Sequence, residues 1–138
     1  MPARDAFHDA VRHGLEKDGW TITHDPLTIR AEFGQMYIDL GAEKILAAER
    51  GSQKIAVEIK SFIQNSPISE FHTALGQFIN YRTILAEQDP DRILYLAIPR
   101  DTYSSFFSLK LIQSIVLENR LKLIVYRPEQ EVISQWIS

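Results

Sequence analysis

Cysteine is absent from this 138-residue sequence, which excludes disulfides, thiolate metal sites and cysteine nucleophiles. The sequence also lacks an apolar run long enough to span a bilayer, and its N-terminus lacks the basic-then-apolar layout of a secretion signal. An excess of positive charge is missing too, because the formal net charge is −3. We therefore expect a cytoplasmic protein without membrane contact, whose binding to DNA would need a local basic patch or a partner subunit.

What is present fits one globular domain over residues 1–138, because 45% of the residues are hydrophobic and no linker or repeat interrupts them. Helical spacing of apolar residues predicts three helices. They are expected over 5–18, ended by Gly19, over 66–87, ended by Asp89-Pro90-Asp91, and over 103–119.

Extended apolar runs predict the strands between these helices. They are expected over 20–23, with 27–30 as a short extension, and over 36–40, 54–60, 92–98 and 121–126. Residues 43–49 suit a helix in composition, although their position favours a strand, and Arg50-Gly51-Ser52-Gln53 is a predicted turn that makes 44–60 a hairpin. The tail 129–138 fits a last strand or a short helix. The order α-β-β-β-α-β-α-β predicts an α/β fold with a mixed central sheet flanked by helices.

Charged residues close two of the predicted strands. Asp39 follows apolar residues in the run 36–40, where it is expected to share a face with Tyr37. Glu58 and Lys60 end the run 54–60, and they are expected on the face opposite its apolar odd-numbered residues because side chains alternate along a strand. An acid, followed on another strand by an acid and a lysine two residues apart, is typical of a metal-dependent phosphodiesterase site.

Asp39 and Glu58 could hold Mg²⁺, which prefers oxygen ligands and needs only one or two protein carboxylates. The carbonyl of Ile59 could add a third oxygen. Such a cation would polarise the phosphoryl oxygen and help to generate hydroxide, while Lys60 could position the water or stabilise the transition state. A solvent-facing strand edge that carries a Glu and a Lys explains the same pattern equally well.

The residues Asp39 and Glu58-Ile59-Lys60, between a leading and a following helix, resemble the PD-(D/E)xK restriction-endonuclease-like superfamily. This resemblance spans the chain from the first helix to the strand at 121–126, although Ile38 stands where the superfamily name has proline. The segments 7–23, 56–62 and 74–82 closely resemble the XisH-type fdxN-element excision controlling factors, which are small cyanobacterial proteins implicated in programmed DNA excision during heterocyst differentiation.

The resemblance implies further site residues. His8 occupies the position at which related nucleases carry a metal-supporting Glu, so it would favour Mn²⁺ over Mg²⁺ or act as a base or a phosphate contact. Gln77 and Tyr81 resemble the Q-x-x-x-Y motif of recombination-associated nucleases, and they would line the site and touch the substrate backbone from one helix face. Without the family match, His8 is an ordinary surface residue and Gln77 a neighbour of an aromatic core position.

Two functions follow as expectations. One is a metal-dependent DNA endonuclease, or a nuclease-like factor, that uses Mg or Mn and assists excision by site-specific recombination. The other is a catalytically inactive DNA- or protein-binding accessory that controls a separate recombinase. DNA and a companion excision factor are the implied partners, and a homodimer could form through the apolar tail 132–137 unless that tail is the last strand of the sheet. Six basic residues could form a phosphate-contacting rim, or simply a solvated surface: Arg4, Arg12, Arg30, Lys44, Lys54 and Arg82.

Overall fold

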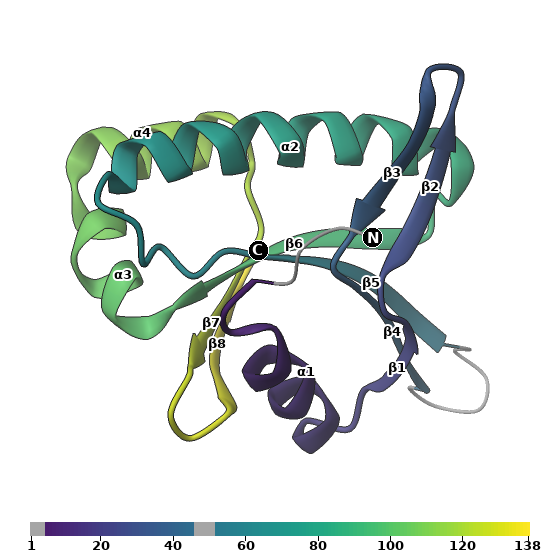
Figure 1. Cartoon of the computed structure of the whole chain (residues 1–138), viewed down its shortest axis with the longest axis horizontal. Coiled ribbons are helices and arrows are strands. Elements are labelled where there is room, and N and C mark those ends of the chain that lie inside the picture. The colour runs from purple at the N-terminus through teal and green to yellow at the C-terminus, as the bar shows by residue number, and fades with distance from the viewer. Residues whose placement is uncertain (1–4, 46–51) are drawn as a thin grey trace.

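The computed structural model describes residues 5–45 and 52–138, which fold around one central sheet (Figure 1). The helical segments are α1 (His8–Lys17), α2 (Pro67–Gln88), α3 (Arg100–Ser104), the short 3-10 helix η2 (Phe106–Ser108) and α4 (Lys110–Glu118). The strands are β1 (Thr21–His24), β2 (Leu27–Ala31), β3 (Gly34–Ile38), β4 (Leu40–Ile45), β5 (Ser52–Ile59), β6 (Arg92–Pro99), β7 (Leu123–Arg127) and β8 (Val132–Ile137).

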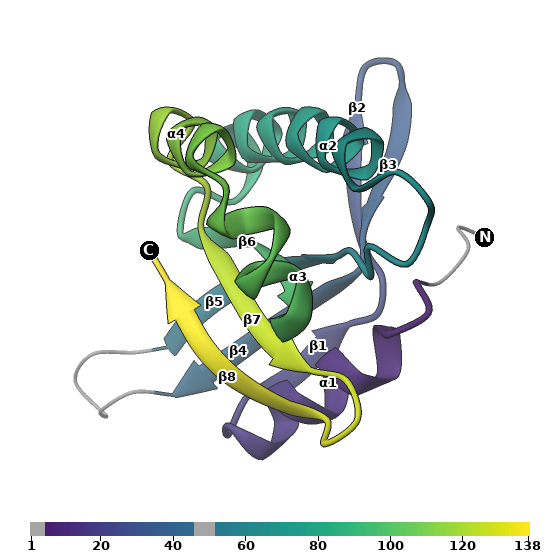
Figure 2. The ribbon, with the colours of Figure 1, turned by 90° about the vertical axis from the view of Figure 1, so that its left-hand side faces the viewer.

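The central sheet is mixed, as predicted. Its six strands run in the order β1-β4-β5-β6-β7-β8, and a separate two-stranded sheet pairs β2 with β3. The pairs β5–β6 and β6–β7 are parallel, whereas β1–β4, β4–β5 and β7–β8 are antiparallel. Figures 1 and 2 show α1 on one face of this sheet and α2 with α4 on the other. Helices therefore flank the sheet on both faces, which confirms the predicted α/β arrangement of a mixed central sheet between helices.

Each face of the sheet has its own hydrophobic core. The core under α2 contains Phe71 and Phe78 with Leu96 of β6, and the core under α1 contains Leu15 with Tyr95 of the same strand. Because neighbouring residues of β6 enter opposite cores, this strand is buried on both faces, as its nearly continuous apolar run predicts.

The alternation predicted for β5 is confirmed. Ile55, Val57 and Ile59 belong to the core under α1, whereas Ala56 belongs to the core under α2. Glu58 and Lys60 follow Ala56 at intervals of two, so the strand directs them toward the α2 side. The charged pair of the motif is thereby placed on the face that α2 covers.

The prediction of one continuous strand over 36–40 is wrong. β3 ends at Ile38 and pairs with β2, whereas β4 begins at Leu40 and pairs with β1 and β5. Ile38 lies in the core under α2, and Leu40 lies in the core under α1. The chain therefore changes sheets at Asp39, because its two apolar neighbours are buried in different cores. Likewise, 27–30 is not an extension of β1 but the strand β2 of the separate hairpin.

The predicted helix over 103–119 is also wrong, because the structure divides this region into α3, η2 and α4. Serine hydroxyls bond to backbone carbonyls at the ends of α3 and η2. Ser105 donates to the Asp101 carbonyl at 2.7 Å, and Ser108 donates to the Ser105 carbonyl at 2.5 Å. Between them, the rings of Phe106 and Phe107 pack against Phe71, with centroids 5.7 and 5.6 Å away. Packing of these two rings against Phe71 thus accompanies the interruption of the helix between α3 and α4.

The other boundaries agree with the sequence more closely. Helix α1 starts at His8 rather than at residue 5, and Gly19, with φ of 91°, takes the left-handed conformation that ends helices. Ser66 caps α2 by accepting the Ser69 N–H at 3.3 Å. The predicted hairpin over 44–60 is confirmed by antiparallel pairing of β4 with β5, although the turn residues Arg50 and Gly51 and the segment 46–49 lie outside the described residues. Within the described residues, no helix has the length and apolarity needed to cross a membrane.

The tail is the strand β8, at the edge of the sheet, which confirms the first of its two readings. Trp136 stacks on Trp20 with ring centroids 5.6 Å apart and meets Tyr95 edge-on at 5.1 Å. These contacts tie β8 to the residues that follow α1 and to the centre of the sheet. The indole is thus part of this chain's own core.

We expect Trp136→Ala to lower the free energy of unfolding by about 2–3 kcal/mol, because it removes two aromatic contacts and leaves a cavity beside Trp20. Thermal unfolding checks the stability, and gel filtration is expected to show an unchanged oligomeric state. The control Leu117→Ala removes a side chain that is 77% exposed and should change the stability little. A lost oligomer with an unaltered melting temperature would instead make the tail a subunit interface.

Candidate active site

Asp39 and Glu58 come together where β3 passes into β4 beside the end of β5. Leu40 pairs with Val57 in the antiparallel ladder, which brings the next residues along each strand, Asp39 and Glu58, side by side. The Ile59 N–H donates to Asp39 Oδ2 at 2.7 Å, and the Asp39 N–H donates to Glu58 Oε1 at 3.4 Å. Each acid is therefore positioned by backbone of the other's strand, and residues 19 positions apart share one site.

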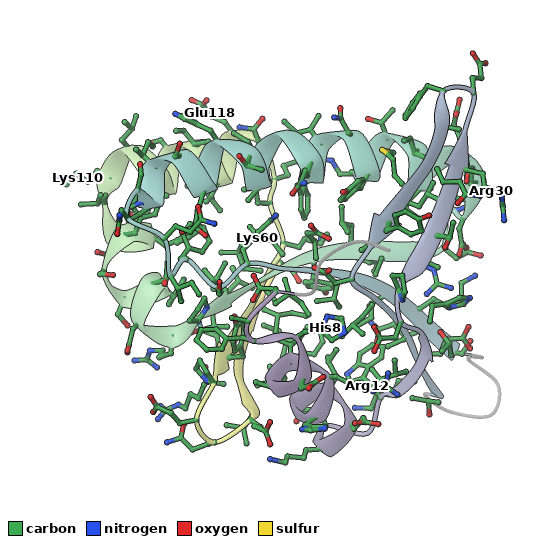
Figure 3. All side chains as sticks on the ribbon, in the orientation of Figure 1. His8, Arg12, Arg30, Lys60, Lys110 and Glu118 are labelled. Atoms are coloured by element: carbon green, nitrogen blue, oxygen red, sulfur yellow. The ribbon has the colours of Figure 1, made fainter. Side chains whose placement is uncertain are left out.

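Lys60 completes the predicted group. Its Nζ lies 3.6 Å from Glu58 Oε2, and its backbone N–H donates to the Ala97 carbonyl at 3.0 Å. Lys60 also lines a cavity of about 280 Å³ that includes Ser69 and Thr73 of α2. Figure 3 shows Lys60 on the side of the sheet that faces α2, with His8 and Arg12 on α1. Of the three charged residues, Lys60 is therefore the one that borders this hollow beside the start of α2.

Burial changes the acidity of both carboxyl groups. Desolvation, followed by repulsion from the Asp39 charge, raises the pKa of Glu58 to about 8 despite the opposing Lys60 charge. Desolvation likewise raises the pKa of Asp39, although the Ile59 N–H and the charges of His8 and Lys60 act to lower it. Ionising both of these closely spaced carboxyl groups is unfavourable, because each loses contact with water and repels the other's charge. The pair therefore retains a proton near neutral pH. A cation between them would displace that proton.

His8 lies near this pair, since its charge lowers the pKa of Asp39. The ring is 4% exposed, which differs from an ordinary surface histidine. Its Nε2 lies 2.8 Å from Asp25 Oδ1, and the other Asp25 oxygen accepts Arg12 Nη1 at 2.6 Å. His8 Nδ1 is buried and has no hydrogen-bond partner within the described residues. Asp25 therefore orients the ring and leaves Nδ1 as the nitrogen that could act on a ligand.

Tyr81 also lies near the acids, whereas the structure assigns Gln77 no contact with them. Burial, then the charges of Glu58 and Asp39, raise the pKa of the Tyr81 phenol to about 12. Gln77 lies one helical turn earlier, so it shares this face of α2. Its Oε1 is buried without a hydrogen-bond partner in the part of the chain that the structure describes. An unpartnered buried amide oxygen is costly, and a bound water or ligand would satisfy it.

Two acids that position the site carry little signal in the sequence. Asp5 precedes α1, where it accepts the Phe7 N–H at 2.9 Å and the Ser61 N–H at 3.0 Å. It thereby fastens the start of α1, and with it His8, to the residue after Lys60. Asp25, which lies between β1 and β2, holds His8 and Arg12. Both acids act through contacts with residues distant in sequence, which local periodicity does not reveal.

The donor set fits a hard divalent cation better than zinc. Asp39 and Glu58 offer carboxylate oxygens, and within the described residues no group of three or more His, Asp or Glu side chains could hold a metal. Mg²⁺ and Mn²⁺ tolerate such a site because water can complete their coordination. Zinc usually takes three or four protein ligands. The residues thus fit the predicted Mg or Mn, with Asp39 and Glu58 as the side chains that would hold it.

The five described candidates for a basic rim lie on five different elements. Arg12 binds Asp25, Lys54 binds Asp89 at 2.7 Å, and Arg82 donates to the Asn119 carbonyl at 2.6 Å. Lys44 lies over the Trp20 ring at 5.8 Å, Arg30 is exposed on the β2–β3 hairpin, and Arg4 lies outside the described residues. These cations serve several local roles instead of forming one phosphate-binding edge.

Comparisons with known proteins agree on one family. A sequence model of the XisH family, described as XisH protein, matches residues 1–134. The crystal structure of an XisH family protein from Nostoc punctiforme is 51% identical, with a TM-score of 0.88, and the match covers 97% of this chain and 100% of that one. That of an fdxN element excision controlling factor protein from Anabaena variabilis is 54% identical, with a TM-score of 0.89, and covers 98% and 100%. No curated protein matches the chain.

The raised pKa of Glu58 predicts a pH-dependent gain in stability for Glu58→Gln. Between pH 4.5 and about 8 the folded protein holds a proton that the unfolded chain releases. The wild type is therefore destabilised progressively as the pH rises through this window. We expect Glu58→Gln to match the wild type near pH 4 and to be more stable by a few kcal/mol, on the order of 2–4, at pH 8. Urea unfolding across this range measures the difference.

The exposed Glu87, which lies on α2 rather than on β5, provides the control. Glu87→Gln removes the same charge without touching the buried pair, so its stability should follow the wild type at every pH. Parallel curves for Glu58→Gln and the wild type from pH 4 to 9 would show that Glu58 ionises normally, and the account of a proton-sharing pair would then be wrong.

Proposed function

The chain belongs to the XisH family, and we propose that it is a Mg- or Mn-dependent DNA endonuclease, or a nuclease-like factor, that assists programmed DNA excision. A relative that is 54% identical is described as an fdxN element excision controlling factor, which supports a role in excision. The observation that carries the chemistry is the convergence of Asp39, Glu58 and Lys60 at the end of β5. A restriction-endonuclease-like fold is part of this proposal.

Each residue of the site has a role that follows from its contacts. Asp39 and Glu58 hold the cation, which when bound supplies charge neutralisation at the phosphodiester and lowers the pKa of water. Lys60 lies close enough to Glu58 to meet the phosphate group beside it, where its charge stabilises the transition state. Tyr81, whose raised pKa keeps the phenol protonated, donates a hydrogen bond to the substrate backbone. Gln77 and His8, through their unpartnered atoms, contact the substrate or its water.

Cleavage assays with linear, nicked and branched DNA test this proposal. With Mn²⁺ or Mg²⁺ present, we expect the wild type and Glu87→Gln to cut, and we expect Glu58→Gln to lose at least about 100-fold in rate, because it removes a ligand. Mn²⁺ binding, followed by the electron paramagnetic resonance signal of the free ion, gives a readout besides activity. Glu58→Gln should weaken Mn²⁺ binding, whereas Lys60→Met should retain it and still fail to cut. Equal behaviour of wild type and Glu58→Gln on every substrate would refute the catalytic role.

The second candidate function is a non-catalytic accessory that controls a separate recombinase. It is favoured by the way the charged groups balance one another within the chain, since Lys60 pairs with Glu58 and His8 pairs with Asp25. The net charge of −3 also favours contact with a protein partner over unaided binding to DNA. In this role the carboxyl pair is a relic, and the fold serves as a DNA- or protein-binding scaffold, alone, as a homodimer or with a companion excision factor.

Gel filtration with the purified companion excision factor distinguishes the two functions. An accessory is expected to co-elute with its partner, and Glu58→Gln should form the same complex and support excision as well as the wild type. Separate elution of the two proteins would count against an obligate complex. Loss of excision in Glu58→Gln, with the complex intact, would assign the function to the carboxyl site rather than to the scaffold.

A further inference from the structure

A second cavity, of about 200 Å³, lies at the opposite end of the parallel strands from the acids. It is bounded by the second half of α2, the start of β6 and the link from α4 to β7, which descends beside α2 in Figure 1. The lining residues are Phe78, Arg82, Leu85, Ala86, Pro90, Arg92, Ile93, Leu94, Arg120 and Lys122. Arg92 of the lining pairs with Lys54 in the ladder, and Lys54 lies four residues before Glu58, so this part of the cavity lies about 13 Å along β5 from the carboxyl pair.

The lining is basic and contains no acid. Four of its ten residues are cations, namely Arg82, Arg92, Arg120 and Lys122, in a chain whose net charge is −3. The acid Asp89 binds one of these cations, Arg92, at 2.9 Å, and it also binds Lys54 at 2.7 Å. Although burial acts to raise the pKa of Asp89, hydrogen bonds from these two cations hold it below its ordinary value. The single negative charge of Asp89 is thus shared between two cations. The net charge of the cavity lining therefore stays positive.

The two inner arginines are held in place by the protein. Arg92 is 8% exposed, and its Nη1 donates to the Ile55 carbonyl at 2.9 Å. Arg82 Nη1 donates to the carbonyls of Asn119 and Arg120, and its guanidinium lies 5.3 Å from the centre of the Phe78 ring. A guanidinium has five N–H donors, so further donors remain on each after these bonds. Their positions are fixed before any ligand arrives, which lowers the entropy lost on binding.

The two outer cations, Arg120 and Lys122, form no ion pair with any other described residue. Within the residues that the structure describes, no hydrogen bond or ion pair involves the side chain of Arg120 or Lys122. Leu121 between them is buried in the core, so its neighbours turn the other way, toward the cavity. Glu87 and Glu118 are exposed and do not line the cavity.

We propose that this cavity binds a phosphate monoester. A monoester carries close to two negative charges and three strong acceptor oxygens, which match a positive cavity with several unused donors. The planar guanidinium forks of Arg82 and Arg92 suit phosphate oxygens. A carboxylate or a single phosphodiester carries only one charge and leaves more of the cations unbalanced. The volume admits a phosphate with a small attached group on the apolar floor of Phe78 and Leu85, which is less than most cofactor sites hold.

Binding of inorganic phosphate and phenyl phosphate to the full-length protein tests this site. Calorimetric titrations are made without metal and at constant ionic strength, so that general screening is the same throughout. We expect saturable binding of both ligands to the wild type, and binding at least 10-fold weaker to Arg120→Gln/Lys122→Gln. Neither side chain has a structural partner, so this variant should keep the melting temperature of the wild type.

Arg30→Gln/Lys110→Gln is the matched control, because it removes two exposed cations elsewhere on the surface (Figure 3). It should bind phosphate as the wild type does. An equal loss in the control would show that net charge, rather than the cavity, attracts the anion. Absence of saturable binding to the wild type would overturn the proposal. Binding of an oligonucleotide without a terminal phosphate, with no binding of inorganic phosphate or phenyl phosphate, would overturn it in favour of a nucleic-acid contact.

This site is independent of the proposed nuclease. Glu58→Gln leaves the cavity untouched, so we expect it to bind phosphate like the wild type whether or not the wild type cleaves DNA. A protein that cuts DNA but binds no phosphate here refutes the cavity alone. A protein that binds phosphate but cuts nothing refutes the nuclease alone.

Discussion

The enforced proximity of two carboxyl groups, the buried Glu58 and the half-buried Asp39, is the constraint on which the rest of the structure depends. Leu40 and Val57 pair in the sheet, and this register leaves Asp39 and Glu58 no alternative to lying side by side. The chain satisfies them with the Ile59 N–H, the Asp39 N–H and the Lys60 ammonium. Holding two carboxyl groups so close together, away from water, is unfavourable when either is charged. Buried acids with raised pKa values are concentrated at functional sites. The surrounding elements then act as a frame that keeps the two groups in place.

The sequence predicted the parts of this site that depend on local periodicity. Alternation along 54–60 correctly placed Glu58 and Lys60 on the face opposite Ile55 and Ile59, and apolar spacing correctly placed the long helix that covers them. Both patterns arise within a single element, where side-chain direction follows from the backbone period. The same reasoning assigned the mixed sheet, because a strand flanked by helices with a nearly continuous apolar run is a central strand.

The features that the sequence did not predict depend on contacts between segments distant in sequence. The run 36–40 reads as one strand, since nothing local shows that Ile38 and Leu40 are buried in different cores. The helix over 103–119 keeps its apolar spacing, yet burial of Phe106 and Phe107 against Phe71 divides it. Asp5 and Asp25 position His8 through contacts with residues distant in sequence, so the local sequence pattern around them does not reveal this role. The roles of Asp39, Glu58, Lys60, His8, Gln77 and Tyr81 stay predictions.

The change of sheet at Asp39 has a mechanical consequence. β3 of the projecting hairpin ends at Ile38, so the residue that joins the hairpin to the main sheet is itself one of the paired acids. The hairpin carries Phe33, 75% exposed, at its far end (Figure 1). A displacement of the hairpin relative to the main sheet would therefore act first on the backbone at Asp39, where the chain passes between the two sheets.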